Sequence, residues 1–174
     1  MESVLIRQAL ARDVEGILAV YAPYVTDTAV SFEYDVPTPE EFEIRLVSIA
    51  AKYPYLVAEE NGEIIGFSYG SRFQERKAYD FDAEVSIYIQ ETHRRRNTGK
   101  RLYTELETLL VRQGIRNVYA KIACPAEEPD PYLNRDSILF HQACGYREAG
   151  HFHRCGFKFG RWYDLVCMEK ILIP

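Results

Sequence analysis

The segment Glu84-Val-Ser-Ile-Tyr-Ile-Gln-Glu-Thr-His-Arg-Arg-Arg-Asn-Thr-Gly-Lys-Arg-Leu-Tyr103 decides how the middle of this chain folds. Its apolar residues alternate up to Ile89, which predicts a β-strand from Glu84 to Ile89. A basic turn follows and opens directly into an amphipathic helix from Gly99 to Gly114. This order brings free backbone N–H groups and the positive end of a helix dipole to one point, which suits a pyrophosphate. One strand therefore leads from a carboxylate, Glu84, to a phosphate-binding turn.

The composition indicates one globular domain that spans residues 1–174. The chain has 174 residues, of which 47% are hydrophobic and 13% aromatic, and this is sufficient for a full core. Its formal net charge of -5 argues against a nucleic-acid partner. The basic residues between Arg94 and Arg101 are a local exception to this acidic balance.

The sequence predicts a soluble, cytoplasmic protein without a membrane partner. The segment from Met1 to Arg7 lacks the charged-then-apolar pattern of a signal peptide, and no apolar run reaches the length of a membrane span. Four cysteines lie far apart without a C-x-x-C pair, which indicates reduced thiols that act as small core residues. They are Cys124, Cys144, Cys155 and Cys167.

The remaining elements follow from periodicity, turn residues and helix caps. We expect Asp13 to cap a helix that Pro23 breaks or bends, and Thr38 and Glu41 to form a capping box at the start of a second helix. The Asn61-Gly62 pair predicts a hairpin. The expected strands are 4–9, 55–60, 63–70, 84–89, 117–123 and two within 147–153 and 162–171, and the later helices are 99–114 and 134–143. This order predicts a mixed α/β domain and not a regular doubly wound array.

Short segments spread along the chain carry a family resemblance. They are Ser31-Phe-Glu33, Tyr53-Pro-Tyr-Leu-Val-Ala-Glu59, Ala78-Tyr-Asp80, Glu84, Ile87-Tyr-Ile89, Asn134, Ser137, His141, Gly145-Tyr146 and Gly156-Phe-Lys-Phe-Gly-Arg-Trp162. With the strand, turn and helix described above, they resemble the GNAT family of acetyl-CoA-dependent N-acetyltransferases, and within it the phosphinothricin and methionine-sulfone or sulfoximine acetyltransferases. The resemblance implies a central, mostly antiparallel, twisted sheet flanked by about four helices.

The resemblance implies acetyl-CoA as the cosubstrate and the basic turn as its phosphate site. The implied ligands are Arg94, Arg95, Arg96, Asn97, Thr98, Gly99 and Lys100, through backbone N–H groups and basic side chains. The family turn has glycine where this chain has Asn97, and asparagine is the other residue that best tolerates left-handed backbone geometry. We therefore expect the turn to keep its shape and to bind the cofactor more weakly. The alternative is a solvated basic loop without a ligand.

The resemblance also places the pantetheine arm of CoA between the central strand and the last helix. Backbone groups of Ile87, Tyr88 and Ile89 are implied to bond the arm like an added strand and to stabilise a developing oxyanion. Asn134 and Ser137 are implied to touch the arm. The alternative for the strand residues is a structural part in the core.

Glu84 is the implied general base, and His141 is implied to assist proton movement. An amine must lose a proton before or during its attack on a thioester, and a carboxylate in an apolar setting accepts that proton. We expect Tyr79, Phe81 and the strand itself to supply this setting. By its spacing His141 shares a helix face with Ser137. The alternatives are an ordinary surface carboxylate and a satisfied core histidine.

The acceptor implied by the resemblance is a small molecule with a primary amine. Phe32, Glu33, Phe73 and Arg76 are the expected acceptor-site residues, and Arg76 would bind an amino-acid carboxylate through two hydrogen bonds. A solvated loop charge is the alternative for Arg76. The resemblance also implies a homodimer. The rival function is a non-catalytic sensor of CoA or of an amino acid on the same fold, with Asn97 marking decay of the cofactor site.

The pair His151-x-His153, with Cys144 and Cys155 nearby in sequence, raises the question of a metal site. Alternate residues of a strand share one face, so the two imidazoles are neighbours. The sequence offers no acidic third ligand and no zinc-type spacing beside them. We therefore expect no metal in this protein.

Overall fold

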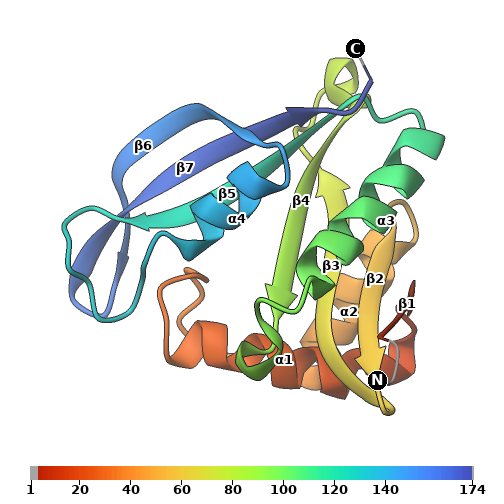
Figure 1. The fold of residues 1–174 in the computed structure, drawn as a ribbon, viewed down its shortest axis with the longest axis horizontal. Coiled ribbons are helices and arrows are strands. Elements are labelled where there is room, and N and C mark those ends of the chain that lie inside the picture. Colours follow the sequence, from red (N-terminus) through yellow and green to blue (C-terminus); the bar gives the residue numbers. More distant parts are fainter. Residues whose placement is uncertain (1–3, 174) are drawn as a thin grey trace.

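The computed structural model describes residues 4–173, whose centre is a seven-stranded sheet in the order β1-β2-β3-β4-β5-β7-β6 (Figure 1). The strands are β1 Leu5–Gln8, β2 Tyr55–Glu60, β3 Glu63–Arg72, β4 Asp82–Ile89, β5 Asn117–Pro125, β6 Arg147–Lys158 and β7 Arg161–Ile171. The helices are α1 Val14–Thr26, α2 Pro39–Ala50, α3 Thr98–Arg112 and α4 Asp136–Ala143, with short 3-10 turns at Ala11–Asp13, Lys77–Tyr79 and Glu91–His93. The predicted mixed α/β class and the predicted order of elements are confirmed.

The start and the end of α1 differ from the sequence prediction. Asp13 makes no capping bond; its carboxylate accepts hydrogen bonds from Arg7 at 2.7 Å and from the Leu10 N–H at 2.8 Å. The Arg7 guanidinium lowers the pKa of Asp13, so this ion pair takes the place of the cap. The helix also continues through Pro23 to Thr26, because a proline in the last turn removes few helical hydrogen bonds.

Two later boundaries also differ from the prediction. The Asn134 side chain accepts the Asp136 N–H at 2.9 Å and forms a turn, so α4 begins at Asp136 and not at Asn134. β6 continues beyond His153 to Lys158, because a bulge between Phe152 and Gly156 absorbs extra residues while the strand stays paired with β7.

Two local turn signals are confirmed. Thr38 accepts the Glu41 N–H at 3.2 Å, and the Glu41 carboxylate accepts the Thr38 N–H at 2.9 Å, which is the predicted capping box of α2. Asn61 and Gly62 join β2 to β3 with φ angles of 54° and 81°. Two consecutive positive φ angles fit the tightest hairpin turns, for which Asn-Gly is the preferred pair.

β4 and β5 form a parallel pair in a sheet that is otherwise antiparallel. They are paired only from Asp82–Glu84 to Asn117–Tyr119, and then they diverge (Figure 1). β4 continues beside β3 to Ile89, while β5 continues beside β7 to Pro125. The middle of the sheet is therefore open, and one backbone edge of β4 is left without a strand partner.

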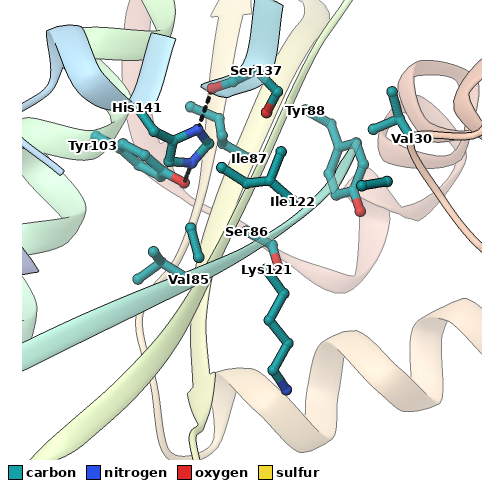
Figure 2. A pocket seen from close by; sticks show the side chains of 12 residues that line it. Val30, Val85, Ser86, Ile87, Tyr88, Tyr103, Lys121, Ile122, Ser137 and His141 are labelled. Carbon is teal, nitrogen blue, oxygen red and sulfur yellow. Dashed lines mark hydrogen bonds between the residues drawn. The ribbon is translucent and has the colours of Figure 1, made fainter. Parts of the chain in front are cut away.

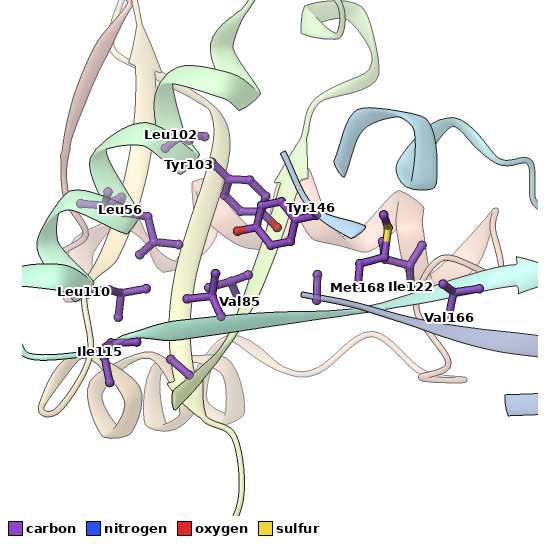
Figure 3. Close-up of a cluster of buried hydrophobic side chains, with 14 of the residues drawn as sticks. Leu56, Val85, Leu102, Tyr103, Leu110, Ile115, Ile122, Tyr146, Val166 and Met168 are labelled. Atoms are coloured by element: carbon purple, nitrogen blue, oxygen red, sulfur yellow. The ribbon is translucent and has the colours of Figure 1, made fainter. Parts of the chain in front are cut away.

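Helices cover both faces of the sheet. On one face Leu102 and Leu110 of α3 are fully buried beside Val85 of β4 (Figure 3). On the opposite face Ile17 of α1 is buried with Phe67 of β3. These two cores hold β4 firmly, so its open edge keeps a fixed position. None of the helices in residues 4–173 is both long and apolar enough to cross a membrane.

Candidate active site

The basic turn between β4 and α3 presents a row of free backbone N–H groups. Arg95 and Asn97 have φ angles of 62° and 66°, so Asn97 adopts the left-handed conformation expected of it. The first backbone bond of the helix runs from the Arg101 N–H to the Asn97 carbonyl, at 3.1 Å. In the described part of the chain, no acceptor meets the N–H groups of residues 95–100. This N–H cradle, at the positive end of α3, suits an anion.

Gly99 fixes this cradle against α4. A Cβ atom at Gly99 would lie 3.0 Å from the ring of Phe140 and 3.6 Å from the side chain of Ile87. The first distance is tighter than most real contacts, so a larger residue would push α3 away from α4. Glycine at this position therefore reflects close packing between the cradle, β4 and α4.

The basic side chains of the turn form an exposed rim around the cradle. The Arg94 guanidinium lies 5.3 Å from the centre of the Tyr24 ring, a cation–π contact. Among the described residues, Arg95 and Arg96 make long ion pairs, at 4.0 Å to Asp136 and 3.9 Å to Glu60. Long exposed pairs contribute little stability. These charges are thus available to a phosphate at the surface.

A cavity lies where β4 and β5 diverge. Ser86, Ile87 and Tyr88 form one wall and residues 121–123 of β5 the other, while Ser137 and His141 of α4 close it (Figure 2). Asn134 lies ahead of α4, and its amide nitrogen bonds Asp136 at 3.2 Å. The structure therefore brings Ser137 and His141 to the cavity beside Ile87 and leaves Asn134 at the surface.

The direction of the backbone groups of β4 shows which of the residues 87–89 can bind the pantetheine arm of CoA. The Gln90 N–H bonds the Ile65 carbonyl of β3 at 2.8 Å. Because successive residues of a strand turn their backbone groups to opposite sides, Tyr88 also faces β3, whereas Ile87 and Ile89 face the opening. The Tyr24 hydroxyl bonds both backbone groups of Ile89. Ile87 is therefore the residue of the predicted three that offers free backbone groups to the opening.

Glu84 lies at the point where the strands diverge. Its Oε2 atom is 2.7 Å from the Lys121 Nζ, and the Glu84 side chain is 24% exposed. Tyr79 and Phe81, expected to surround it with apolar groups, are 39% and 60% exposed because they belong to the solvated loop before β4. The expectation is wrong for these two residues, and Lys121 is a partner of Glu84 that the sequence did not reveal.

The apolar surroundings of Glu84 come instead from aromatic residues on the α1 and α2 side of the sheet. Tyr69 stacks on Tyr55 with ring centres 4.7 Å apart. Burial above all raises the pKa of Tyr69, and the nearby carboxylates of Glu84 and Glu33 add to the effect. Tyr88 is partly buried, and its loss of contact with water raises its pKa well above the usual value. We call Tyr21, Tyr55, Phe67, Tyr69 and Tyr88 the aromatic floor.

Contacts with other residues of the chain hold the predicted acceptor residues Phe32 and Glu33 in position. Glu33 accepts a hydrogen bond from the Tyr21 hydroxyl at 2.6 Å and pairs with Arg45 at 2.7 Å. Phe32 lies against Gly156, where a Cβ atom would come within 2.4 Å of its ring. Glu33 borders the aromatic floor through its hydrogen bond with Tyr21, and its charge adds to that of Glu84 in raising the pKa of Tyr69.

Phe73 and Arg76 lie in the loop that joins β3 to β4. Phe73 stacks on Tyr119 with ring centres 4.1 Å apart, and Tyr119 is the register partner of Glu84. Phe73 is thus near Glu84. Arg76 is exposed, and no ion pair to it occurs within residues 4–173. Its side chain is available to an anionic group of a ligand.

His141 is buried, and both of its ring nitrogens are engaged. Its Nδ1–H donates to the Ser137 carbonyl at 2.7 Å, and its Nε2 accepts from the Tyr103 hydroxyl at 2.8 Å (Figure 2). Burial lowers the pKa of His141 to about 4. The imidazole is therefore neutral near pH 7, which argues against the predicted part in proton movement. Its evident contribution is to orient Tyr103 at the cavity wall.

Lys158 connects the hairpin of β6 and β7 to the loop that carries Phe32 and Glu33. Its ammonium is buried and donates to three backbone carbonyls, those of Val25 at 2.7 Å, Thr28 at 3.0 Å and Ser31 at 2.7 Å. Buried charges require such partners. Lys158 thereby fixes the start of the loop that leads to Glu33.

The two histidines of β6 have an acidic neighbour that the sequence analysis missed. His151 and His153 both contact the Asp164 carboxylate, at 2.8 Å and 3.2 Å. Asp164 lies on β7, so only the pairing of the two strands reveals the contact. The statement that no acidic third ligand accompanies these histidines is therefore wrong.

Replacement of His141 by Gln should reduce the decrease in unfolding free energy that occurs as the pH falls. The folded-state pKa of about 4 lies below the usual 6.5, so His141 contributes stability that is present above pH 6.5 and disappears as the pH falls to 4. Between pH 7 and pH 4 the native protein should lose about 3 kcal/mol more than the variant. Urea unfolding at both pH values measures this, with His93→Gln as a histidine control. Identical pH dependence in the native protein and His141→Gln would contradict the assignment.

Replacement of Lys158 by Met should loosen the loop before Glu33. The change removes the shared donor of three carbonyls, and we expect unfolding free energy to fall by about 1–3 kcal/mol. Amide hydrogen exchange of residues 27–33 should accelerate, while the core of α3 stays protected. Lys52→Met, at an exposed position, is the matched control. Unchanged exchange in residues 27–33 would show that Lys158 does not hold the loop.

Comparison with known proteins relates this geometry to an enzyme family. A family model described as an acetyltransferase (GNAT) domain matches residues 6–167. The chain is 33% identical over 167 residues to the phosphinothricin N-acetyltransferase of Streptomyces viridochromogenes, which covers 96% of this chain and 87% of that relative. It is 29% identical over 177 residues to the L-methionine sulfoximine/L-methionine sulfone acetyltransferase of Pseudomonas paraeruginosa, with 99% and 96% of the two chains covered.

Solved structures agree with this result. A GNAT superfamily phosphinothricin acetyltransferase from Sinorhizobium meliloti, in complex with AcCoA, matches with a TM-score of 0.87 and 33% identity over 98% of this chain and 89% of that chain. YncA from Salmonella typhimurium, with its cofactor acetyl-CoA, matches with a TM-score of 0.88 and 25% identity over 99% and 95%. The chain therefore belongs to the GNAT acetyltransferase family.

Proposed function

We propose that this acetyltransferase moves the acetyl group of acetyl-CoA to the primary amine of a small amino-acid-like molecule, of the phosphinothricin or methionine sulfoximine or sulfone type. Both substrates are bound together, and no covalent enzyme intermediate forms. One observation carries the proposal: the opening between β4 and β5 runs from Glu84, where the strands diverge, toward the N-H cradle of residues 95–100. Glu84 and the cradle thus lie before and after the stretch of β4, residues 85–88, that lines the cavity.

The residues of the opening fit acetyl-CoA, which supplies an acetyl group activated as a thioester. The N–H cradle receives the pyrophosphate, and the exposed side chains of Arg94, Arg95, Arg96 and Lys100 surround it with positive charge. The free backbone groups of Ile87 hydrogen-bond the pantetheine arm as an added strand would. The Ser137 side chain lines the same cavity. The Ile87 N–H is also the donor we assign to the thioester oxygen.

Glu84 is the group we assign as general base. Lys121 holds the Oε2 atom at 2.7 Å and so fixes the orientation of the carboxylate. The Oε1 atom then accepts a proton from the acceptor amine, directly or through a water molecule. The aromatic floor behind it limits the access of bulk water from that side. Neutral His141 has a positioning part here, because it holds the Tyr103 hydroxyl.

Acceptor recognition combines the carboxylate of Glu33 with the guanidinium of Arg76. Glu33, held by Tyr21 and Arg45, attracts the ammonium form of the acceptor before proton loss. Arg76 binds an acceptor carboxylate, for which its planar guanidinium is suited. Phe32 and Phe73 provide apolar contact. Together these groups favour a zwitterionic molecule over a simple alkylamine.

We also propose that the protein forms a homodimer through the β6–β7 hairpin. Three large side chains of this hairpin, Phe152, Phe157 and Trp162, are 57%, 48% and 53% exposed. The ring centres of Phe157 and Trp162 lie 5.0 Å apart, and exposed apolar groups that gather on a surface commonly mark an interface. Light scattering should give twice the 20.2 kDa mass of one chain; a monomer at micromolar concentration would contradict this. A cytoplasmic location stays a prediction from the sequence.

Thiol release from acetyl-CoA tests the reaction and the base together. With methionine sulfone, methionine sulfoximine and phosphinothricin as acceptors, the native protein should release CoA thiol. Glu84→Gln should lower kcat by about 100-fold to 10,000-fold with little change in acetyl-CoA affinity. Glu63→Gln, an exposed carboxylate of the β2–β3 hairpin, is the matched control.

Each possible outcome of this assay has a clear meaning. Equal turnover of the native protein and Glu84→Gln at saturating substrate would remove Glu84 as the base. Binding of CoA without thiol release for any amine would identify the rival, a non-catalytic sensor. Release with simple alkylamines but not with the amino-acid-like acceptors would overturn the acceptor class and leave the reaction intact.

A further inference from the structure

We propose that His151, His153 and Asp164 form a binding site for a divalent transition-metal ion of the Zn²⁺ type. His151 and His153 lie on β6 and Asp164 lies on β7. None of these three residues lines the cavity between β4 and β5. The site is therefore separate from the acetyl-transfer site and does not depend on the proposed function.

The spacing of the three side chains suits a small ion. The His151 Nε2 and the His153 Nδ1 lie 2.8 Å and 3.2 Å from the same Asp164 Oδ2 atom, and all three ligand atoms are within 4.8 Å of one another. In a tetrahedral zinc site with bonds of about 2.1 Å, ligand atoms lie about 3.4 Å apart. Small side-chain rotations therefore open the cluster enough for an ion. Two imidazole nitrogens and one carboxylate oxygen are ligands that zinc and cobalt both accept.

The bulge in β6 creates this arrangement. Register pairs Phe152 with Leu165 and Gly156 with Tyr163, so residues 153–155 all lie opposite Asp164. Arg154 takes a left-handed φ of 47°, and its N–H donates to the Asp164 Oδ1 at 2.7 Å. This hydrogen bond fixes the carboxylate and directs Oδ2 toward the histidines. Such outer partners are typical of sites that hold a metal ligand in one orientation.

The environment of the cluster also favours a cation with an open coordination position. The two imidazole rings stack with centres 4.3 Å apart, and both use one carboxylate oxygen. The His153 side chain is 75% exposed whereas that of Asp164 is 10% exposed, so the cluster has a buried anchor and an open side. The neighbouring Arg154 guanidinium pairs with Glu127 at 2.8 Å, which keeps that positive charge occupied elsewhere. A water molecule can complete a four-coordinate site from the open side.

Calorimetric titration of the whole chain with ZnCl2, after treatment with a chelator, tests the proposal. The native protein should bind one ion per chain, and thermal unfolding should shift to higher temperature in its presence. His151→Gln and Asp164→Asn should each weaken binding by at least about tenfold. If the change at buried Asp164 prevents folding, His151→Gln still tests the site.

Two controls separate this site from other groups that bind zinc. Cys155→Ser removes the exposed thiol, and His93→Gln removes another histidine–carboxylate pair, His93 with Glu60. Both variants should keep the affinity of the native protein. Titration with CoCl2 should give the visible absorption of tetrahedral Co²⁺ with nitrogen and oxygen ligands. Absence of binding, binding that His151→Gln retains, or loss of binding in Cys155→Ser would overturn the proposal.

Discussion

The divergence of β4 from β5 beyond Glu84 and Tyr119 is the constraint on which the rest of the site depends. Each strand keeps its outer partner, β3 for β4 and β7 for β5, so the sheet opens without either half losing its own hydrogen bonds. The opening exposes backbone groups that a closed sheet would have used. α4 and the start of α3 lie over it, and the contact of Gly99 with Phe140 holds them there. Cosubstrate binding in this fold is thus a consequence of an incomplete strand pair.

The two faces of β4 have different roles, one in packing and one in the chemistry of the site. One face packs against α3, where large buried side chains hold the strand in position. The other face carries Glu84 above the aromatic floor, with Glu33 at its border. Tyr21 of this floor and Arg45 of α2 hold Glu33 by a hydrogen bond and an ion pair, while Lys158 holds the preceding loop through the Ser31 carbonyl. The helix α3, the aromatic floor and the loop of Phe32 and Glu33 are thus held by packing and hydrogen bonds. The loop that carries Arg76 is the exposed part of the acceptor site.

Local signals in the sequence were sufficient for the elements and for the turn. Alternation up to Ile89, the left-handed tolerance of Asn97 and the capping box of Thr38 each act within a few residues, and the structure has all three. Family resemblance added the site residues, which the chemistry of a single sequence does not determine. The cap expected at Asp13 failed because Arg7, a partner outside the helix, binds the same carboxylate.

The groups that the sequence did not reveal are partners across long separations. Lys121 meets Glu84 from the neighbouring strand, and Tyr24 meets Ile89 from α1. Asp164 meets two histidines only because a bulge sets the register of β6 against β7. His141 is of a residue type that often carries protons, yet burial lowers its pKa and keeps it neutral, and both of its ring nitrogens are engaged by Tyr103 and Ser137. The partners of these residues and the protonation of His141 depend on strand register and on burial, which the periodicity of the sequence does not specify.

A crystal structure of the native chain with acetyl-CoA tests the central claim most directly. We predict that the pyrophosphate bonds the N–H groups of residues 95–100 and that the arm bonds Ile87 in the opening between β4 and β5, with the thioester on the side of Glu84. A cosubstrate bound elsewhere, or strands β4 and β5 closed onto each other with the ligand outside, would contradict it.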